Sequence, residues 1–169
     1  MTKTWMRALA GLVLAGALGA TPVIAAADSI ESEIELLRTD IKAGKVDIVK
    51  RAIDVQGAKA DAFWPVYRQY QLDLDKIGDK RLALIKDYAA NYKSMTDEKA
   101  HTLTTQALDL QAARTNLLKK YYKNFEKVLG ATDAARLVQV EHLVNSLMDI
   151  QVAASIPLIE KPAAATPSP

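Results

Sequence analysis

Apolar residues recur at steps of three and four along most of the chain, a spacing that predicts amphipathic helices. The longest such stretch runs from about Ala58 to Asn91, and only Arg81 places a charge in its apolar row. The row consists of Phe63, Tyr67, Tyr70, Leu74, Ile77, Arg81, Leu84, Tyr88 and Tyr92. Pro65 lies inside it and lacks an amide proton, so it marks either the first turn of a helix that begins near Phe63 or a bend in a longer helix.

A second long helix is predicted after a turn at residues 92–96. Thr96 is a natural N-cap, the acids Asp97 and Glu98 favour the positive end of a helix, and Gly130 predicts its end. The apolar row here consists of Ala100, Leu103, Ala107, Leu110, Arg114, Leu117, Tyr121 and Phe125. Two long helices joined by a short turn run antiparallel. The expected register places Phe63 opposite Phe125, Tyr67 opposite Tyr121, Leu74 opposite Arg114 and Arg81 opposite Ala107.

Shorter amphipathic segments flank this hairpin. Residues 29–43 carry the row Ile30, Ile34, Leu37 and Ile41, with Gly44 as the expected helix end. Val46, Val49 and Ile53 suggest a short second helix or turn. A last helix is expected to start at Thr132 and Asp133, to stop at Pro157, and to present Leu137, Val140, Val144, Leu147 and Ile150 on one face. The predicted fold is therefore all-α: a long antiparallel helical hairpin with additional N- and C-terminal helices, arranged as a bundle or cradle.

The first 27 residues have the pattern of a secretory signal peptide. Lys3 and Arg7 precede an uncharged run, and three alanines ending at Ala27 come just before the first acid, Asp28. Glycines and a proline interrupt the run, which favours a cleaved signal over an uncleaved membrane anchor. We expect residues 1–27 to be a signal peptide, 28–159 a helical domain in the periplasm with no stable membrane span after cleavage, and 160–169 a disordered tail.

Charge and cysteine content exclude several classes of function. Lys3 and Arg7 account for two of the 22 basic residues, so the chain beyond Ala27 carries 20 basic against 20 acidic residues. This balance gives no support to nucleic-acid binding through a basic surface. The chain has no cysteine, which excludes disulfides, thiolate nucleophiles and the acyl-cysteine anchor of a lipoprotein.

The sequence carries no recognisable catalytic or metal-binding motif. His101 and His142 are the only histidines, they lie on different predicted helices, and neither has a second histidine three or four residues away. No phosphate-binding loop, nucleophile elbow or His-Glu-x-x-His motif occurs. We therefore predict a protein that is not an enzyme and that has no cofactor and no metal site.

Aromatic and arginine residues in the hairpin are the candidate binding residues. Seven aromatic side chains are expected to gather at the end away from the turn: Phe63, Trp64, Tyr67, Tyr70, Tyr121, Tyr122 and Phe125. They form either a core where four helices meet or a concave surface for clients or partners. Arg81 and Arg114 each need a carboxylate, and Asp109 is the candidate for Arg81, with Asp73 or Asp75 for Arg114. The alternative role of these arginines is to recognise acidic groups on a client.

The chain resembles the Spy/CpxP group of periplasmic proteins, which are small, exported, helical and built around a long hairpin. Their mark is a Leu-Thr-x-x-Gln segment that opens a helix twice. The corresponding segments here are Ile53-Asp54-Val55-Gln56-Gly57-Ala58 and Leu129-Gly130-Ala131-Thr132-Asp133-Ala134, neither of which matches it literally. The chain is also similar to uncharacterised proteobacterial exported proteins that share Phe63-Trp64-Pro65-Val66-Tyr67, Tyr88-Ala89-Ala90-Asn91-Tyr92 and Ile156-Pro157-Leu158-Ile159.

The Spy/CpxP resemblance implies a helical cradle, often a homodimer, that holds unfolded clients without ATP or assists an envelope stress sensor. The first hypothesis is therefore a periplasmic chaperone-like or envelope-stress binding protein whose partners are unfolded or envelope proteins. The second hypothesis is a structural or adaptor protein that binds a single envelope partner. A metal-responsive periplasmic protein is the third.

Overall fold

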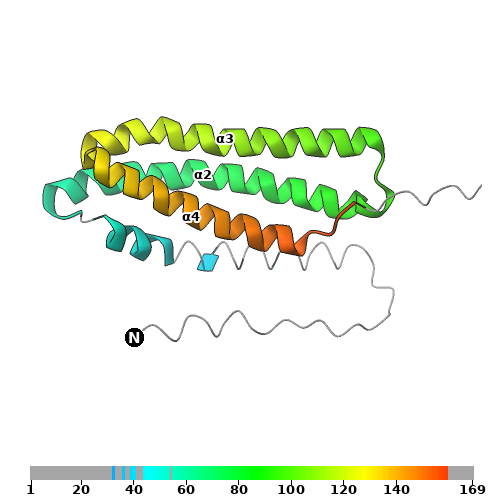
Figure 1. Cartoon of the computed structure of the whole chain (residues 1–169), viewed down its shortest axis with the longest axis horizontal. Coiled ribbons are helices and arrows are strands. Elements are labelled where there is room, and N and C mark those ends of the chain that lie inside the picture. The colour runs from blue at the N-terminus through cyan, green and yellow to red at the C-terminus, as the bar shows by residue number, and fades with distance from the viewer. Residues whose placement is uncertain (1–31, 33–35, 37–38, 41–43, 54, 160–169) are drawn as a thin grey trace, which may run out of the picture.

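The computed structural model describes residues 32, 36, 39, 40, 44–53 and 55–159, and their fold is helical throughout (Figure 1). Helix α2 spans Gly57–Asn91, a short 3-10 turn η2 covers Tyr92–Ser94, helix α3 spans Asp97–Leu129 and helix α4 spans Ala131–Ser155. Residues 44–52 form a further helical segment before α2. The predicted all-α hairpin with flanking helices is confirmed. The expected signal peptide and tail lie outside the described residues, as does most of the helix expected at 29–43.

The helix boundaries follow from local chemistry at the predicted positions. The Thr96 hydroxyl accepts a hydrogen bond from the Lys99 N–H at 3.2 Å, which caps α3 as expected. Gly130 separates α3 from α4 with φ at 82°, a conformation that glycine adopts without a Cβ clash. Pro157 follows directly after the C-cap of α4. Gly44, in contrast, was expected to end a helix and instead lies within the helical segment 44–52.

Pro65 lies in the interior of α2, because that helix begins eight residues earlier at Gly57. The alternative of a helix that begins near Phe63 is therefore wrong. Proline in the helix interior removes the hydrogen bond to the carbonyl four residues back. The side chain is exposed, so water can reach this part of the backbone.

The main core lies at the end of the hairpin away from the turn. Phe63 on α2 packs against Phe125 on α3 with ring centroids 5.9 Å apart, which confirms the predicted pairing. Tyr70 contacts Tyr121 at 5.4 Å, and no Tyr67–Tyr121 ring contact accompanies it among the described residues. The buried members of this core are Val49, Ile53, Phe63, Tyr67, Tyr70, Tyr121, Phe125, Leu129, Ala134 and Leu137. Near the turn, a second cluster has only Ile85 and Val152 as buried members. Apolar packing is therefore dense at one end and sparse at the other.

Helix α4 returns along the hairpin from Gly130 toward the turn (Figure 1). Polar contacts join it to α2 at three levels. The Tyr67 hydroxyl donates to Glu141 near the middle of α4, and Arg81 donates to Asp149 farther along. The Tyr88 hydroxyl donates to the Pro157 carbonyl, at 2.5 Å, beyond the end of the helix. These contacts hold α4 beside the hairpin, and the sparse apolar packing near the turn leaves a cavity between the helices.

Candidate functional site

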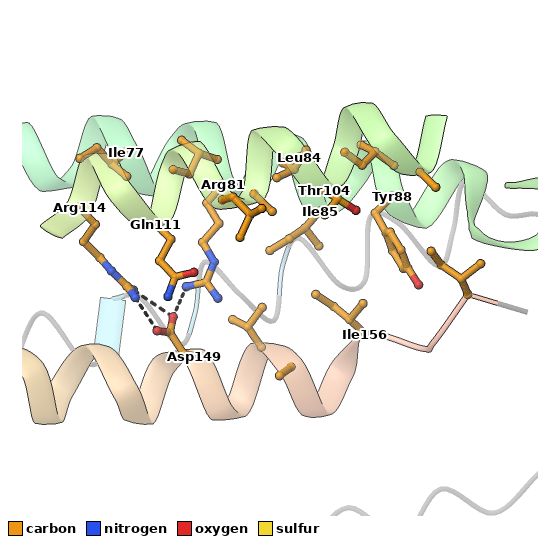
Figure 2. Close-up of a pocket in the computed structure, with 18 of the residues that line it drawn as sticks. Ile77, Arg81, Leu84, Ile85, Tyr88, Thr104, Gln111, Arg114, Asp149 and Ile156 are labelled. Carbon is orange, nitrogen blue, oxygen red and sulfur yellow. Dashed lines mark hydrogen bonds and ion pairs between the residues drawn. The ribbon is translucent and has the colours of Figure 1, made fainter. Parts of the chain in front are cut away.

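An open cavity of about 540 Å³ lies between α2, α3 and α4 at the turn end of the molecule (Figure 2). Its walls are mainly aliphatic and include Leu84, Ile85, Leu103, Ala107, Val152 and Ile156. The volume falls within the range of roughly 300–1,000 Å³ that small-molecule sites occupy. The cavity forms where the helices bring too few large side chains together to fill the space between them.

Three charged side chains close the end of the cavity nearer the aromatic core. Arg114 on α3 donates from both terminal nitrogens to Asp149 on α4, with Nη1–Oδ1 at 3.0 Å and Nη2–Oδ2 at 2.6 Å. Arg81 on α2 donates to Asp149 Oδ1 through its Nη1. Figure 2 shows the two guanidinium groups converging on this carboxylate from neighbouring helices. One acid on α4 thus holds together all three helices.

The predicted partners of the two arginines are wrong. Asp109, expected beside Arg81, is exposed on α3, and Asp73 instead accepts hydrogen bonds from Lys76 at 2.9 Å and from the Tyr121 hydroxyl at 2.7 Å. Arg114 likewise pairs with Asp149 rather than with Asp73 or Asp75. The prediction considered only the two helices of the hairpin, whereas α4 supplies a carboxylate that both arginines reach. Cross-helix pairing itself is confirmed.

The charge balance at this end of the cavity favours an anion. Among the described residues, Arg81, Arg114 and Asp149 are the only charged side chains that line the cavity, and together they leave one net positive charge. Burial is the largest single influence on the Asp149 pKa and raises it, but the Arg114 hydrogen bond and the two guanidinium charges together bring that pKa below its ordinary value. The hydrogen bond to Asp149 raises the pKa of Arg114. Asp149 and Arg114 are therefore both charged at neutral pH.

A second polar cluster surrounds the completely buried Glu141. Its carboxylate accepts hydrogen bonds from Lys45 at 2.7 Å, from the Tyr67 and Tyr70 hydroxyls at 2.9 and 3.0 Å, and from Gln71 at 3.4 Å. Burial, followed by the Glu141 charge, raises the pKa of both tyrosines, which keeps the two hydroxyls protonated as donors. The cluster joins the 44–52 helix to α2 and α4. Both oxygens of the Glu141 carboxylate each accept two hydrogen bonds from side chains of the protein, which indicates a structural role.

Glu141 was not predicted as a buried residue. Of the five residues expected on one face of α4, Leu137 and Val144 are buried, whereas Leu147 and Ile150 are exposed. The inward row is Ala134, Leu137, Glu141, Val144, Met148 and Val152, again at steps of three and four. The predicted row avoided the acid and chose only apolar residues. An acid at a heptad core position of an otherwise apolar row was the signal available in the sequence.

Most of the predicted aromatic binding residues lie in the core. Phe63, Tyr67, Tyr70, Tyr121 and Phe125 are all buried, so they are not available to a client in this structure. Trp64 is half-buried against the same core, with the Lys50 ammonium 5.9 Å from its ring centroid. The core alternative is therefore the correct one for the five buried rings. Their large apolar area is more favourable packed together than facing water.

An uncovered apolar row runs along the outer side of α4. Leu143, Leu147 and Ile150 are 58%, 52% and 65% exposed, and they follow one another at steps of four and three. Leu147 and Ile150 were expected to share a helix face with Leu137 and Val144, but those two residues are buried and Leu147 and Ile150 lie outside their face. Helix α4 is apolar on two sides, and the side that contains Glu141 faces inward because Lys45, Tyr67 and Tyr70 satisfy its carboxylate there. We call Leu143, Leu147 and Ile150 the outer α4 row.

Histidines and carboxylates do not converge within the part of the chain that the structure describes. His101 and His142 are both exposed on separate helices, and no group of three or more metal-ligating side chains occurs among the described residues. Among these same residues, no helix combines the length and the apolar character that crossing a bilayer requires.

Comparison of the chain with protein-family models, with curated proteins and with solved structures gives no match. The chemistry of the cavity and of the outer α4 row is therefore the basis for assigning a function.

Proposed function

We propose that the protein is a periplasmic, ATP-independent chaperone-like protein that holds apolar segments of unfolded envelope proteins. The proposal depends on the outer α4 row. Its three large aliphatic side chains, spaced by four and three residues, are each more than half exposed. Rows of this kind mark surfaces that bind other apolar groups. The signal-like first 27 residues and the resemblance to Spy/CpxP proteins support the compartment and the class.

The expected strength of this surface suits reversible binding without an energy source. Complete burial of a Leu or Ile side chain contributes about 1.5–3 kcal/mol, so covering the exposed half of each contributes roughly 1 kcal/mol. Three such side chains supply roughly 3–5 kcal/mol, from which the cost of ordering the client is subtracted. An unfolded client would therefore bind weakly, exchange rapidly and leave without ATP.

Light scattering, which follows the aggregation of unfolded client proteins, tests the proposal. Purified protein at high concentration and in large molar excess over the client is expected to slow the aggregation of two unrelated clients, such as reduced insulin and a heat-unfolded dehydrogenase, because binding of this strength leaves little client bound at equimolar ratio. Replacement of the outer row in the double variant Leu147→Ser/Ile150→Ser should remove most of this protection. Leu72→Ser is the matched control, because Leu72 on α2 is similarly exposed, at 56%, but lies outside the outer row.

Two results would contradict the proposal. One is the absence of protection for either client even in large molar excess of the protein. The other is the same loss of protection in the Leu72→Ser variant as in the double variant, which would show that the outer α4 row has no special role. Recovery of a single stoichiometric partner together with no general protection would favour an adaptor instead.

A further inference from the structure

We propose that the cavity between α2, α3 and α4 binds a long-chain carboxylate of the fatty-acid class. The carboxylate would lie against Arg81 and Arg114, and the alkyl chain would follow the aliphatic walls toward Tyr88 and Ile156. The inference is independent of the proposed chaperone function, because it uses the inner side of α4 and not the outer α4 row.

The dimensions of the cavity fit an extended chain. The lining residues on α3 run from Ala100 to Arg114. A helical rise of about 1.5 Å per residue gives this wall a length of roughly 20 Å. The cavity is therefore long enough to hold an extended alkyl chain.

The distribution of polar groups also favours an alkyl chain over an extended peptide. An extended peptide brings an N–H and a C=O at every residue, and each needs a partner when it leaves water. The walls beyond the arginines are formed largely by Leu, Ile, Val and Ala side chains, which offer no such partners. An alkyl chain needs none and gains about 0.8 kcal/mol for each buried methylene.

The charged end supplies the specificity for an acid. Two guanidinium groups share the single Asp149 carboxylate, so one positive charge is left over. Arg81 meets Asp149 through Nη1 alone, and a guanidinium group has five N–H donors. The Arg81 and Arg114 side chains are a third and a quarter exposed, which keeps them accessible from the cavity. A ligand carboxylate placed here would complete the charge balance.

Calorimetric titration with dodecanoate, kept below its micellar concentration, tests the inference on the whole protein. One dodecanoate is expected to bind per chain. Dodecanol, which has the same chain without the charge, should bind roughly ten- to a hundredfold more weakly, as should dodecanoate to Arg81→Gln. Arg136→Gln is the matched control, because Arg136 is exposed on α4 and does not line the cavity.

A second pair of variants tests the location of the site without disturbing the ion pairs. Ala107→Trp fills the cavity and should abolish binding, whereas Ala112→Trp, also exposed on α3 but outside the cavity, should leave it unchanged. Circular dichroism confirms that each variant is folded. The inference is overturned if dodecanoate does not bind, if dodecanol binds equally well, or if the two tryptophan variants behave alike. None of these results bears on client protection, which the outer α4 row is proposed to provide.

Discussion

Replacement of Glu141 by Gln is expected to destabilise the protein strongly. Glu141 is completely buried, Lys45 is 5% exposed, and their charged atoms lie 2.7 Å apart. Glutamine has nearly the same shape but keeps only one oxygen, so one of the Tyr67 and Tyr70 hydroxyls, which donate to different carboxylate oxygens, loses its acceptor. The Lys45 ammonium, however, loses its counter-charge and keeps the Gln71 side-chain oxygen at 3.2 Å and the Tyr70 ring, whose centroid is 5.9 Å away.

The size of the effect follows from this geometry. Removal of one partner of a buried ion pair costs about 3–5 kcal/mol, because the other charge stays buried without compensation. This is a large share of the roughly 5–15 kcal/mol by which a typical domain is stable. The melting temperature should fall by on the order of 10 °C. Glu126→Gln is the matched control on the surface of α3, where a change of about 0.5 kcal/mol or less is expected.

Urea unfolding followed by circular dichroism measures the difference, and a double-mutant cycle with Lys45→Met isolates the pair. Lys45→Met should cost much less in the Glu141→Gln background than in the native protein, because it removes a lysine that is already unpaired. We expect a coupling energy of roughly 2 kcal/mol or more. If the two substitutions add to within about 0.5 kcal/mol, or if Glu141→Gln behaves like Glu126→Gln, the reasoning is wrong.

Two further predictions concern the backbone at two glycines and the ion pairs of Asp149. Gly130→Ala should destabilise by about 1–3 kcal/mol, because φ is 82° there while open space surrounds the position, so the cost is purely conformational. Gly44→Ala, in a helical position with equally open surroundings, should be neutral or stabilising by up to about 1 kcal/mol; equal effects on unfolding by urea would contradict this account. Asp149→Asn should destabilise at neutral pH, and the difference from the native protein should vanish in acid. The folded pKa of Asp149 is lowered, so its contribution is complete above the unfolded value of about 3.9 and is lost as the pH falls below it. A difference that persists unchanged at low pH would show that the ion pairs are not its source.

The sequence was sufficient for the hairpin because its signals are local and agree with one another. Thr96, Gly130 and Pro157 each define a boundary through their own backbone or capping chemistry, and all three were predicted. The opposition of Phe63 and Phe125 followed from the length of the turn alone.

The packing of α4 against the hairpin was harder to predict, because it depends on which side of that helix faces inward. That helix has two apolar sides, so periodicity alone favoured the row with Leu147 and Ile150. The alternative row contains Glu141, whose burial is favourable only when Lys45 and the two tyrosines arrive from elsewhere in the sequence. Asp149 was missed for the same reason, since its partners lie on two other helices.

Site-specific photo-cross-linking tests the central functional claim most directly. A photoreactive side chain placed at Leu147, in the outer α4 row, should cross-link to an unfolded client in proportion to the protection observed. The same group at Lys119, which is exposed on α3, should give little product. Cross-linking at Lys119 as strong as at Leu147, or none at Leu147 while protection persists, would contradict the claim that clients bind to the outer α4 row.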